Sequence, residues 1–409
     1  MKKRALILIE GNVMGTGQRY VQAAERLDLH PITLSADPAQ YNYILAEGSH
    51  AIRVDTGDLD ALVRECSQLR AGYDIVGITC ARESFYATAG RLSRHFELAG
   101  PDPLSVERCC DKFAQRQLLA DAGVPVPIYR LAADATDVND SVAQIGLPVV
   151  LKPAAGSGST GVRLCRDVDE VAQHTAHLLG GKHIWRSPPE ILVEEFAEGP
   201  YFSVNIMGNE VVGIAAGEFG PPPHFVYREY TFPAVLTDSE YQRVVDVSLS
   251  CLRALGLGWG PTSIELRWTK RGPVVIEVNP RLAGTPDPQL IKLAYGVDLI
   301  TEHIKLAIGS ECDLRKRHSQ TAAARFLVPD RDGILDSIDG DTQAAAMAGV
   351  AEVKFYIKPK SAIVRKADWR DCIGHVIAAS PTRAQSDEIL QRAVDSIRWS
   401  ITPFPDLNE

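Results

Sequence analysis

Hydrophobic positions in the first 95 residues alternate between short strand-like runs and helix-like spacing. Ala5–Ile9 and Asp74–Thr79 are apolar runs of strand length, and Pro31–Leu34 begins another strand. Gln18–Leu27 has the spacing of an amphipathic helix and lies between the strands predicted at Ala5–Ile9 and Pro31–Leu34. Strand, helix and strand in succession predict a parallel sheet covered by helices.

The loop after the first predicted strand contains glycines, in the segment GNVMGTGQRY at residues 11–20. Gly15-x-Gly17 lacks the third glycine of a dinucleotide-binding fingerprint, and no acidic residue closes a second strand about 20 residues later. We interpret the segment as a structural turn or as part of a co-substrate site. A nicotinamide-binding dehydrogenase is the disfavoured alternative.

The pattern changes at residues 100–103, where two prolines mark a boundary. Beyond it, apolar spacing predicts three helices and two β-hairpins, with a mixed segment after about residue 312. A glycine at the position of a C-terminal cap ends the first of these helices. The expected elements are helix Val106–Ala122 with Gly123 as its cap, hairpins within 190–219 and 261–280, helix Tyr241–Leu255 and helix Arg383–Ile397.

A Gly/Ser-rich loop follows a predicted strand at residues 148–162, and Lys152 lies at the end of that strand. Small residues let backbone N–H groups approach an anion, hydroxyl groups add donors, and the lysine supplies a positive charge. The spacing is not that of a P-loop. We expect a phosphate-binding lid, with a plain turn as the alternative; its residues are Gly156, Ser157, Gly158, Ser159, Thr160 and Gly161.

Two predicted strands near residue 270 carry carboxylates at matching positions. A three-residue connection, Lys270–Gly272, would form a type I turn with a bulge and place Glu265 directly opposite Glu277. Facing carboxylates destabilise a sheet unless a cation lies between them. With Asn279 on the same face, they suit Mg²⁺ or Mn²⁺. A solvated sheet face is the alternative.

Length and charge narrow the class of protein. The 409 residues correspond to about two to three domains. A formal charge of −9 argues against nucleic acid as a partner, because nucleic-acid-binding proteins present basic surfaces. No apolar run reaches the length of a membrane helix. The short apolar run after Met1–Arg4 and the eight scattered cysteines lead us to expect a cytoplasmic protein with reduced thiols and no membrane partner.

Five motifs together resemble the ATP-grasp superfamily across about residues 100–310. They are Lys112 in CCDKFAQRQLLADAGVPVP, Lys152 in VVLKPAAGSGSTGV, and the segments VEEFAEG, SIELR and IEVNPRLAG. NPRLAG followed by PDPQLIKLAYGVDLI is most similar to bacterial L-amino-acid ligases, the dipeptide synthetases of the bacilysin and dapdiamide type.

The resemblance implies an ATP-grasp fold of α/β and α+β architecture, with a Rossmann-like preATP-grasp domain at the N-terminus. Four regions are expected. They are the preATP-grasp domain at 1–100, a lid with a linker helix at 101–190, a central sheet with the metal site at 191–312 and a C-terminal α+β extension at 313–409.

The resemblance also implies residue roles at an ATP site. Lys112 and Lys152 would hold the phosphates beneath the lid, with Lys152 also catalytic. The hinge would bind adenine through backbone groups around Glu195 and Phe196, with the Glu194 carboxylate nearby and Ala197 closing the segment. Glu265, Glu277 and Asn279 would coordinate Mg²⁺ (or Mn²⁺), as two ions, at the phosphates.

The substrate side of the site is implied by the segment after the last metal residue. Arg281 would orient the substrate carboxylate and stabilise the charge that develops there, while Gly284 lets the backbone approach it. The chain departs from D-alanine ligases, which have an acidic ribose contact where Tyr201 lies. It also has Tyr227 and Tyr230 where several amino-acid ligases have Glu and His, so Tyr227 and Arg228 are expected to shape a substrate pocket.

These inferences predict an ATP-dependent ligase that joins a carboxylate to the amine of an L-amino acid through an acyl phosphate. Its partners would be small-molecule carboxylates and amino acids, and a homodimer is one assembly open to it. A bicarbonate- or ribonucleotide-using ATP-grasp enzyme is the main alternative, and a non-catalytic ATP-binding module is a third.

Overall fold

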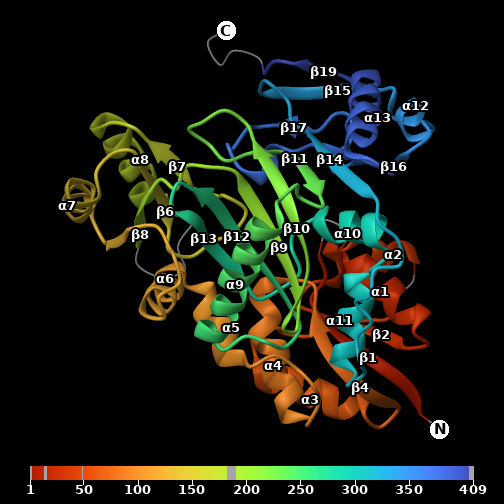
Figure 1. Ribbon diagram of the computed structural model, residues 1–409. Coiled ribbons are helices and arrows are strands. Elements are labelled where there is room, and N and C mark those ends of the chain that lie inside the picture. The colour runs from red at the N-terminus through yellow and green to blue at the C-terminus, as the bar shows by residue number, and fades with distance from the viewer. Residues whose placement is uncertain (1, 13–15, 48, 182–189, 405–409) are drawn as a thin grey trace.

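The computed structural model describes residues 2–12, 16–47, 49–181 and 190–404 (Figure 1). Part of the glycine segment discussed above, residues 13–15, lies outside the described residues. Gly11 and Gly17 lie within them, and a Cβ at either would come within 2.7 Å of the Tyr43 hydroxyl. These two glycines are therefore required by packing, which fits a structural turn.

The N-terminal region is the parallel α/β layer that the hydrophobic pattern predicts. Its four strands lie in the order β3-β2-β1-β4 and all pair in parallel. The elements are β1 (Lys3–Ile9), α1 (Thr16–Arg26), β2 (His30–Ser35), η1 (Pro38–Gln40), α2 (Asn42–Glu47), β3 (Ala51–Arg53), α3 (Leu59–Leu69), β4 (Tyr73–Cys80), η2 (Glu83–Phe85) and α4 (Tyr86–His95).

The predicted helix Val106–Ala122 is two helices, α5 (Pro103–Cys110) and α6 (Lys112–Asp121). Asp111 between them has an extended backbone, and its carboxylate accepts hydrogen bonds from the N–H groups of Phe113 and Ala114. An aspartate in this role is a strong N-cap. The cap places Lys112 at the first position of α6, and Gly123 follows α6 with a positive φ of 74°.

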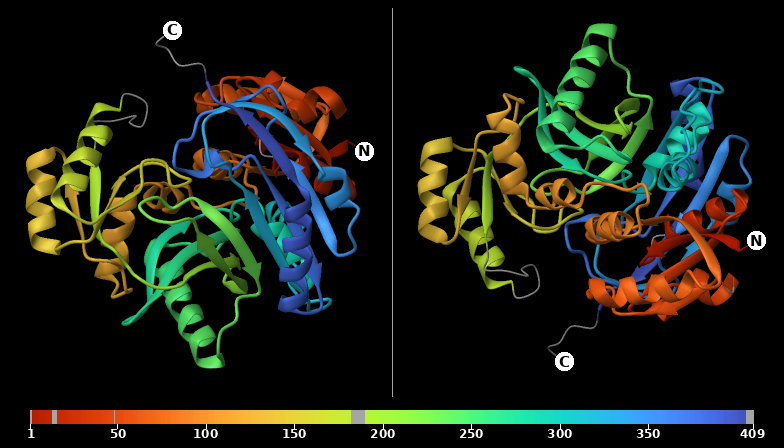
Figure 2. Two further views of the ribbon diagram at one scale, coloured as in Figure 1. Left: turned by 90° about the horizontal axis from the view of Figure 1, so that it is seen from above. Right: turned by 90° about the horizontal axis from the view of Figure 1, so that it is seen from below.

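The lid is a four-stranded antiparallel sheet in the order β5-β8-β6-β7. Its helices project at one end of the molecule (Figures 1 and 2). The last strand runs to residue 195, so the lid sheet extends past the expected limit at 190. The elements are β5 (Tyr129–Ala132), α7 (Ala135–Ile145), β6 (Val149–Pro153), β7 (Arg163–Cys165), α8 (Val168–Gly180) and β8 (Ile191–Glu195).

An eight-stranded sheet forms the centre of the molecule, in the order β13-β12-β9-β10-β11-β14-β18-β16. Strands from both sides of residue 312 belong to it, so the predicted C-terminal extension continues the central sheet rather than standing apart. The strands are β9 (Tyr201–Met207), β10 (Glu210–Phe219), β11 (Tyr227–Phe232), β12 (Pro261–Thr269), β13 (Gly272–Asn279), β14 (Thr321–Leu327), β16 (Val350–Phe355) and β18 (Gly374–Ser380).

Helices and a small second sheet cover this central sheet. One face packs on α9 through an apolar core that includes Val204, Ile264 and Leu252. On the other face, α10 packs against β11, β14 and β18, and α11 joins α10 to α1 and β4 of the N-terminal layer. The remaining elements are α9 (Asp238–Leu255), α10 (Asp287–Tyr295), α11 (Leu299–Ala307), β15 (Gly333–Asp339), α12 (Asp341–Ala345), β17 (Ala362–Ile363), η3 (Trp369–Asp371), α13 (Arg383–Ser396) and β19 (Arg398–Thr402).

The register of β12 against β13 confirms that Glu265 lies opposite Glu277. The predicted three-residue turn is wrong, however, because Thr269 pairs with Gly272 and the connection has two residues, Lys270 and Arg271. A register shift between Glu265 and Leu266 takes up the extra residue. The bulge therefore lies beside the carboxylate pair instead of at the turn, and bulges commonly redirect side chains at functional sites.

All eight cysteines are free thiols. Among the helices of the described chain, none is both long and apolar enough to cross a membrane.

Candidate active site

Glu265 and Glu277 form a partly buried carboxylate pair on one face of the central sheet. Burial and the negative charge of Glu277 raise the pKa of Glu265 to about 7. Burial would also raise the pKa of Glu277, but the neighbouring Lys112 ammonium outweighs it and the pKa is lowered. The negative charge of Glu265 is thus not fully compensated by neighbouring cations, and a cation bound beside it would be stabilised.

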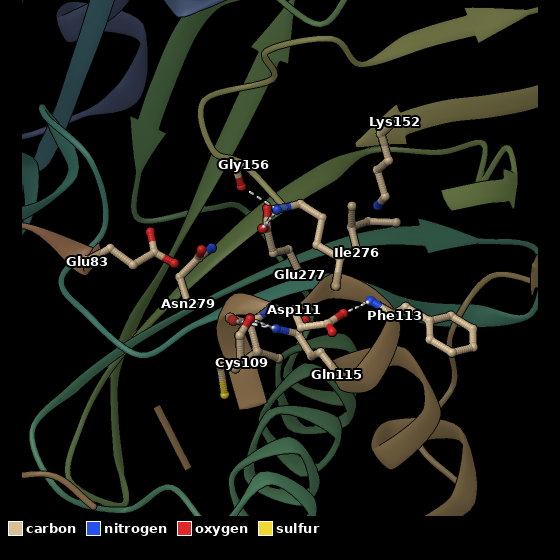
Figure 3. A network of polar contacts seen from close by, with 12 residues as sticks. Glu83, Cys109, Asp111, Phe113, Gln115, Lys152, Gly156, Ile276, Glu277 and Asn279 are labelled. Atoms are coloured by element: carbon tan, nitrogen blue, oxygen red, sulfur yellow. Dashed lines mark hydrogen bonds and ion pairs between the residues drawn. The ribbon is translucent and has the colours of Figure 1, made fainter. Parts of the chain in front are cut away.

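Lys112 connects this pair to the Gly/Ser-rich loop at residues 156–161, which we call the glycine loop. Its Nζ lies 2.7 Å from Glu277 Oε1 and donates a hydrogen bond to the Gly156 carbonyl. Burial alone would lower the pKa of Lys112, but Glu277 raises it, so the ammonium stays charged. Figure 3 shows Glu277 beneath the Gly156 carbonyl, with Lys152 on one side and Glu83 and Asn279 on the other. The Lys112 ammonium therefore joins the loop at Gly156 to the Glu277 carboxylate.

Arg281 is held by two acceptors on different elements. Its Nε lies 2.9 Å from Glu83 Oε2 in η2 of the N-terminal layer, and its Nη2 lies 3.3 Å from Asn279 Oδ1. Sequence reasoning missed Glu83, because nothing in its local pattern indicates that η2 faces β13. The Glu83 carboxylate fixes the guanidinium beside Asn279, so we regard Glu83 as a positioning residue for Arg281.

Lys152 lies in a buried triad rather than at the glycine loop. Glu194 Oε2 is 2.6 Å from Lys152 Nζ, and Glu194 Oε1 is 2.6 Å from Arg116 Nε. Burial lowers the pKa of Lys152, although Glu194 opposes this. Arg116 also donates to the Ile276 carbonyl of β13, which ties the lid sheet to the central sheet. The expected ATP residues Lys152 and Glu194 are thus in direct contact, and Arg116 is a further residue that sequence reasoning missed.

The glycine loop is backed by the C-terminal region. Thr160 Oγ1 lies 3.2 Å from Asp368 Oδ2, and the Trp369 N–H lies 3.4 Å from the Gly158 carbonyl. Gly158 has a φ of +66°, and a Cβ there would lie 2.2 Å from the Trp369 ring. Gly156 and Ser159 also have positive φ, and Ser157 is exposed. We name the segment Asp368–Asp371 the latch, because Asp368 and Trp369 form these two bonds to the loop.

We predict that Gly158→Ala impairs turnover at least about tenfold, because a methyl group there requires both a strained backbone and displacement of Trp369. Steady-state ADP release measures the effect. Gly180→Ala is the control, since a Cβ at Gly180 meets no atom within 4 Å. Trp369→Ala in the same chain should restore part of the loss, because it removes the clash but not the strain. Equal damage in the single and double variants would contradict the role given to Trp369.

The hinge differs in one respect from the expectation. The N–H of Glu195 donates to the Ile128 carbonyl at 2.8 Å and that of Phe196 to the Pro148 carbonyl at 3.4 Å. Glu195 also pairs with Arg271 through its side chain. These two amide N–H groups are therefore committed within the protein. Adenine recognition by the hinge stays a prediction that depends on other backbone groups, including those of the buried Ala197.

Tyr227 faces the site and Arg228 does not contact it. The Tyr227 and Tyr201 hydroxyls are 2.9 Å apart. A register shift in β11 leaves Arg228 as the extra residue, and its side chain lies beside Gly220. Burial raises the pKa of the Cys372 thiol, and the nearby Arg228 charge offsets part of that effect. Among the described residues, no hydrogen bond or ion pair joins Arg228 to the carboxylate pair. Its expected role in shaping a substrate pocket stays a prediction.

Gly284 lies in an exposed turn after Arg281, and a Cβ there would meet no atom within 4 Å. Nothing in the described protein therefore requires glycine at this position. Thr285, the next residue, approaches Thr16 of the N-terminal loop, with their hydroxyls 3.5 Å apart. The turn thus lies where the N-terminal layer meets the site.

The residues present fit a magnesium ion. Glu265 and Glu277 offer facing carboxylates, and Asn279 offers an amide oxygen on the same face; hard divalent cations prefer such oxygen ligands. The Asn279 Oδ1 also accepts a hydrogen bond from Arg281 Nη2 at 3.3 Å. The buried Asn279 Nδ2, which is a donor and not a metal ligand, has no hydrogen-bond partner among the described residues. No group of three or more His, Cys, Asp or Glu side chains suited to a metal occurs in the described chain, so this two-carboxylate set depends on other ligands to complete it.

Comparison with models of known protein families identifies the superfamily of this chain. A model of the ATP-grasp domain matches residues 145–288, which include the lid from β6 to β8, the hinge and the carboxylate pair. The chain therefore belongs to the ATP-grasp superfamily of ligases.

Its C-terminal region narrows this assignment. Residues 325–402 match a model described as L-amino acid ligase C-terminal domain 2. Among solved structures, the L-amino acid ligase from Bacillus licheniformis aligns with a TM-score of 0.81 at 19% identity, covering 98% of this chain and 100% of that one. Because identity is low, this likeness concerns the fold alone.

Curated relatives extend the comparison. The uncharacterized protein y4rH of Sinorhizobium fredii is 62% identical over 407 residues, covering 100% of this chain and 85% of the relative. Dapdiamide A synthase of Enterobacter agglomerans is 25% identical over 368 residues, covering 84% and 82%. Mouse carnosine synthase 1 is 30% identical over 214 residues, covering 48% of this chain and 26% of that protein.

Proposed function

We propose that this chain is an ATP-dependent, ADP-forming ligase that joins a carboxylate to the amine of an L-amino acid. The observation that carries the proposal is the arrangement of Glu265, Glu277 and Arg281 beneath the glycine loop, with Lys112 joining the loop to the sheet. The match of the C-terminal region to an L-amino acid ligase domain supports amino-acid substrates, and the similarity to dapdiamide A synthase supports an amide product.

In the proposed reaction, a carboxylate oxygen of the first substrate attacks the γ-phosphorus of ATP and the bond to the ADP oxygen breaks. This gives an acyl phosphate. The neutral amine of the second substrate then attacks the acyl carbon, the carbon–oxygen bond to phosphate breaks, and the amine nitrogen loses one proton. The products are an amide, ADP and inorganic phosphate.

The chain's own residues position these groups rather than react covalently. Arg281, fixed by Glu83, would orient the substrate carboxylate and stabilise the anionic tetrahedral intermediate. Lys112 and Lys152 would neutralise the phosphates. The glycine loop, held by the latch, would exclude water from the acyl phosphate. Mg²⁺, in our proposal two ions held by Glu265, Glu277 and Asn279, would offset the charge of the phosphate oxygens.

Free thiols support a reducing, cytoplasmic setting for this reaction. We further propose a homodimer, and a division into four regions in which the lid sheet ends at residue 195 and the C-terminal region shares the central sheet.

The testing experiment is a phosphate-release screen of the purified chain with MgATP and pairs drawn from L-amino acids and simple carboxylates. Products are identified by mass spectrometry. We expect at least one pair to give stoichiometric ADP, phosphate and amide. Phosphate release that depends on bicarbonate or on an amino ribonucleotide, with none for amino-acid pairs, would favour the carboxylase or purine type instead. ADP release with no substrate of either kind would contradict both.

A further inference from the structure

Asp287 is a buried carboxylate that the proposed reaction does not yet use. It is the first residue of α10 and is 2% exposed. Its Oδ2 accepts hydrogen bonds from Ser203 Oγ at 2.8 Å and Asn205 Nδ2 at 3.4 Å, both on β9. Its Oδ1 is buried and has no hydrogen-bond partner among the described residues.

No cation compensates this carboxylate. Among the described residues, no Lys, Arg or His forms an ion pair with Asp287, in contrast to the buried Glu194, which has two. Burial raises the pKa of Asp287 to about 6, and the bonds from Ser203 and Asn205 offset only part of that effect. Burying a carboxylate without a compensating cation lowers the stability of the folded state. We therefore look for a cationic partner from outside the chain.

Asp287 belongs spatially to the candidate active site. Ser203, which bonds to it, pairs directly with Glu265 across β9 and β12. Its negative charge raises the pKa of both Tyr227 and Tyr230, in addition to the larger effect of their burial. Asp287 also begins its helix directly after the turn that follows Arg281. The carboxylate thus lies on the substrate side of the metal-site residues.

We propose that Asp287 Oδ1 binds an ammonium group of the amino-acid substrate and so selects substrates that carry one. This inference rests on the proposed function for the identity of the ligand. The ammonium would supply the missing positive charge and the missing hydrogen-bond donor at the same atom, in a charge-assisted hydrogen bond. Because Oδ1 is covered, neighbouring side chains must shift on binding, as is common at binding sites.

A purely structural role for Asp287 predicts something different. If the two β9 bonds were its purpose, removing the charge would leave the protein no more stable, since an amide oxygen can still accept them. If the charge is kept for a ligand, Asp287→Asn relieves an uncompensated buried charge. The Tm of the variant alone should then exceed that of the wild type, while ligand binding is lost.

The ammonium can come from two sources, the α-amino group or a side-chain amine. Isothermal titration in the presence of MgADP distinguishes them, with three kinds of probe. These are unmodified L-amino acids, their Nα-acetyl derivatives, and Nα-acetyl-L-lysine and Nα-acetyl-L-ornithine, which keep only the side-chain amine. Loss of binding on Nα-acetylation of an ordinary amino acid indicates the α-ammonium. Binding of the acetylated diamino acids indicates the side-chain ammonium.

Asp287→Asn should weaken binding of the ammonium-bearing probe at least about tenfold, while MgADP binding is unchanged. Asp341→Asn is the matched control, since Asp341 is also the first residue of a helix but lies in the C-terminal region. The proposal is overturned if Asp287→Asn binds these probes as the wild type does, if its Tm falls markedly, or if no ammonium-bearing probe binds the wild type. Probe binding without phosphate release would contradict the proposed ligase and leave the ammonium site intact.

Discussion

Glu277→Gln should lower ADP formation at least about 100-fold while the protein stays folded. The substitution removes one of the two facing carboxylates and the partner of Lys112, so both the metal site and the lysine's position are lost together. Folding should tolerate it, because Glu83 and Glu265 still lie near the Lys112 ammonium. The substitution also removes the Glu277 charge, which adds to burial in raising the pKa of Glu265. The measurement is steady-state ADP release at saturating Mg²⁺, with Tm recorded on the same samples.

Glu218→Gln is the control for Glu277→Gln. Glu218 also lies on a strand of the central sheet, but it is exposed and forms no ion pair among the described residues. Near-normal ADP release by folded Glu277→Gln would contradict the assignment of the carboxylate pair. A comparable loss in Glu218→Gln would show that the sheet, not the site, is sensitive to this exchange.

Lys152→Ala should also reduce turnover at least about 100-fold, because it removes a positive charge expected at the phosphates. The composition of the buried triad allows Lys152 to be removed without unbalancing the remaining charges. With Lys152 gone, Arg116 and Glu194 remain as a one-to-one ion pair, so no buried charge is left without a partner. We therefore expect a folded protein with weakened MgATP binding, measured by titration with a non-hydrolysable ATP analogue.

Lys152→Met separates charge from packing, since it restores most of the side-chain volume without the ammonium. We expect the Met variant to be as inactive as the Ala variant but more stable. Recovery of turnover in Lys152→Met would mean that Lys152 acts through packing. An unchanged affinity for the nucleotide in both variants would remove Lys152 from the phosphate site and leave it as a structural partner of Glu194.

Local sequence signals predicted much of the fold. Alternating apolar runs found the N-terminal parallel layer, and helical spacing found α9 and α13. The division at Asp111 was missed although the residue is a typical N-cap, because the apolar spacing continues through it. Sequence reasoning also could not show that β14, β16 and β18 join the central sheet, since pairing between distant strands leaves no local pattern.

The site was predictable where one strand or one turn carries it. The Glu265–Glu277 pairing followed from two adjacent strands, even though the bulge lies elsewhere than expected. Glu83, Arg116 and Asp287 could not be found in this way. Each meets its partner across more than 70 positions of the chain, so only the tertiary fold brings them together.

The most direct test of the account follows the oxygen atoms. An active amino-acid pair from the screen is used with ¹⁸O in both oxygens of the donor carboxylate, and the released phosphate is analysed by mass spectrometry. Transfer through an acyl phosphate predicts one ¹⁸O in each phosphate and one retained in the amide. Phosphate without ¹⁸O would contradict the account, because its oxygen would then come from water and the carboxylate would never have been phosphorylated.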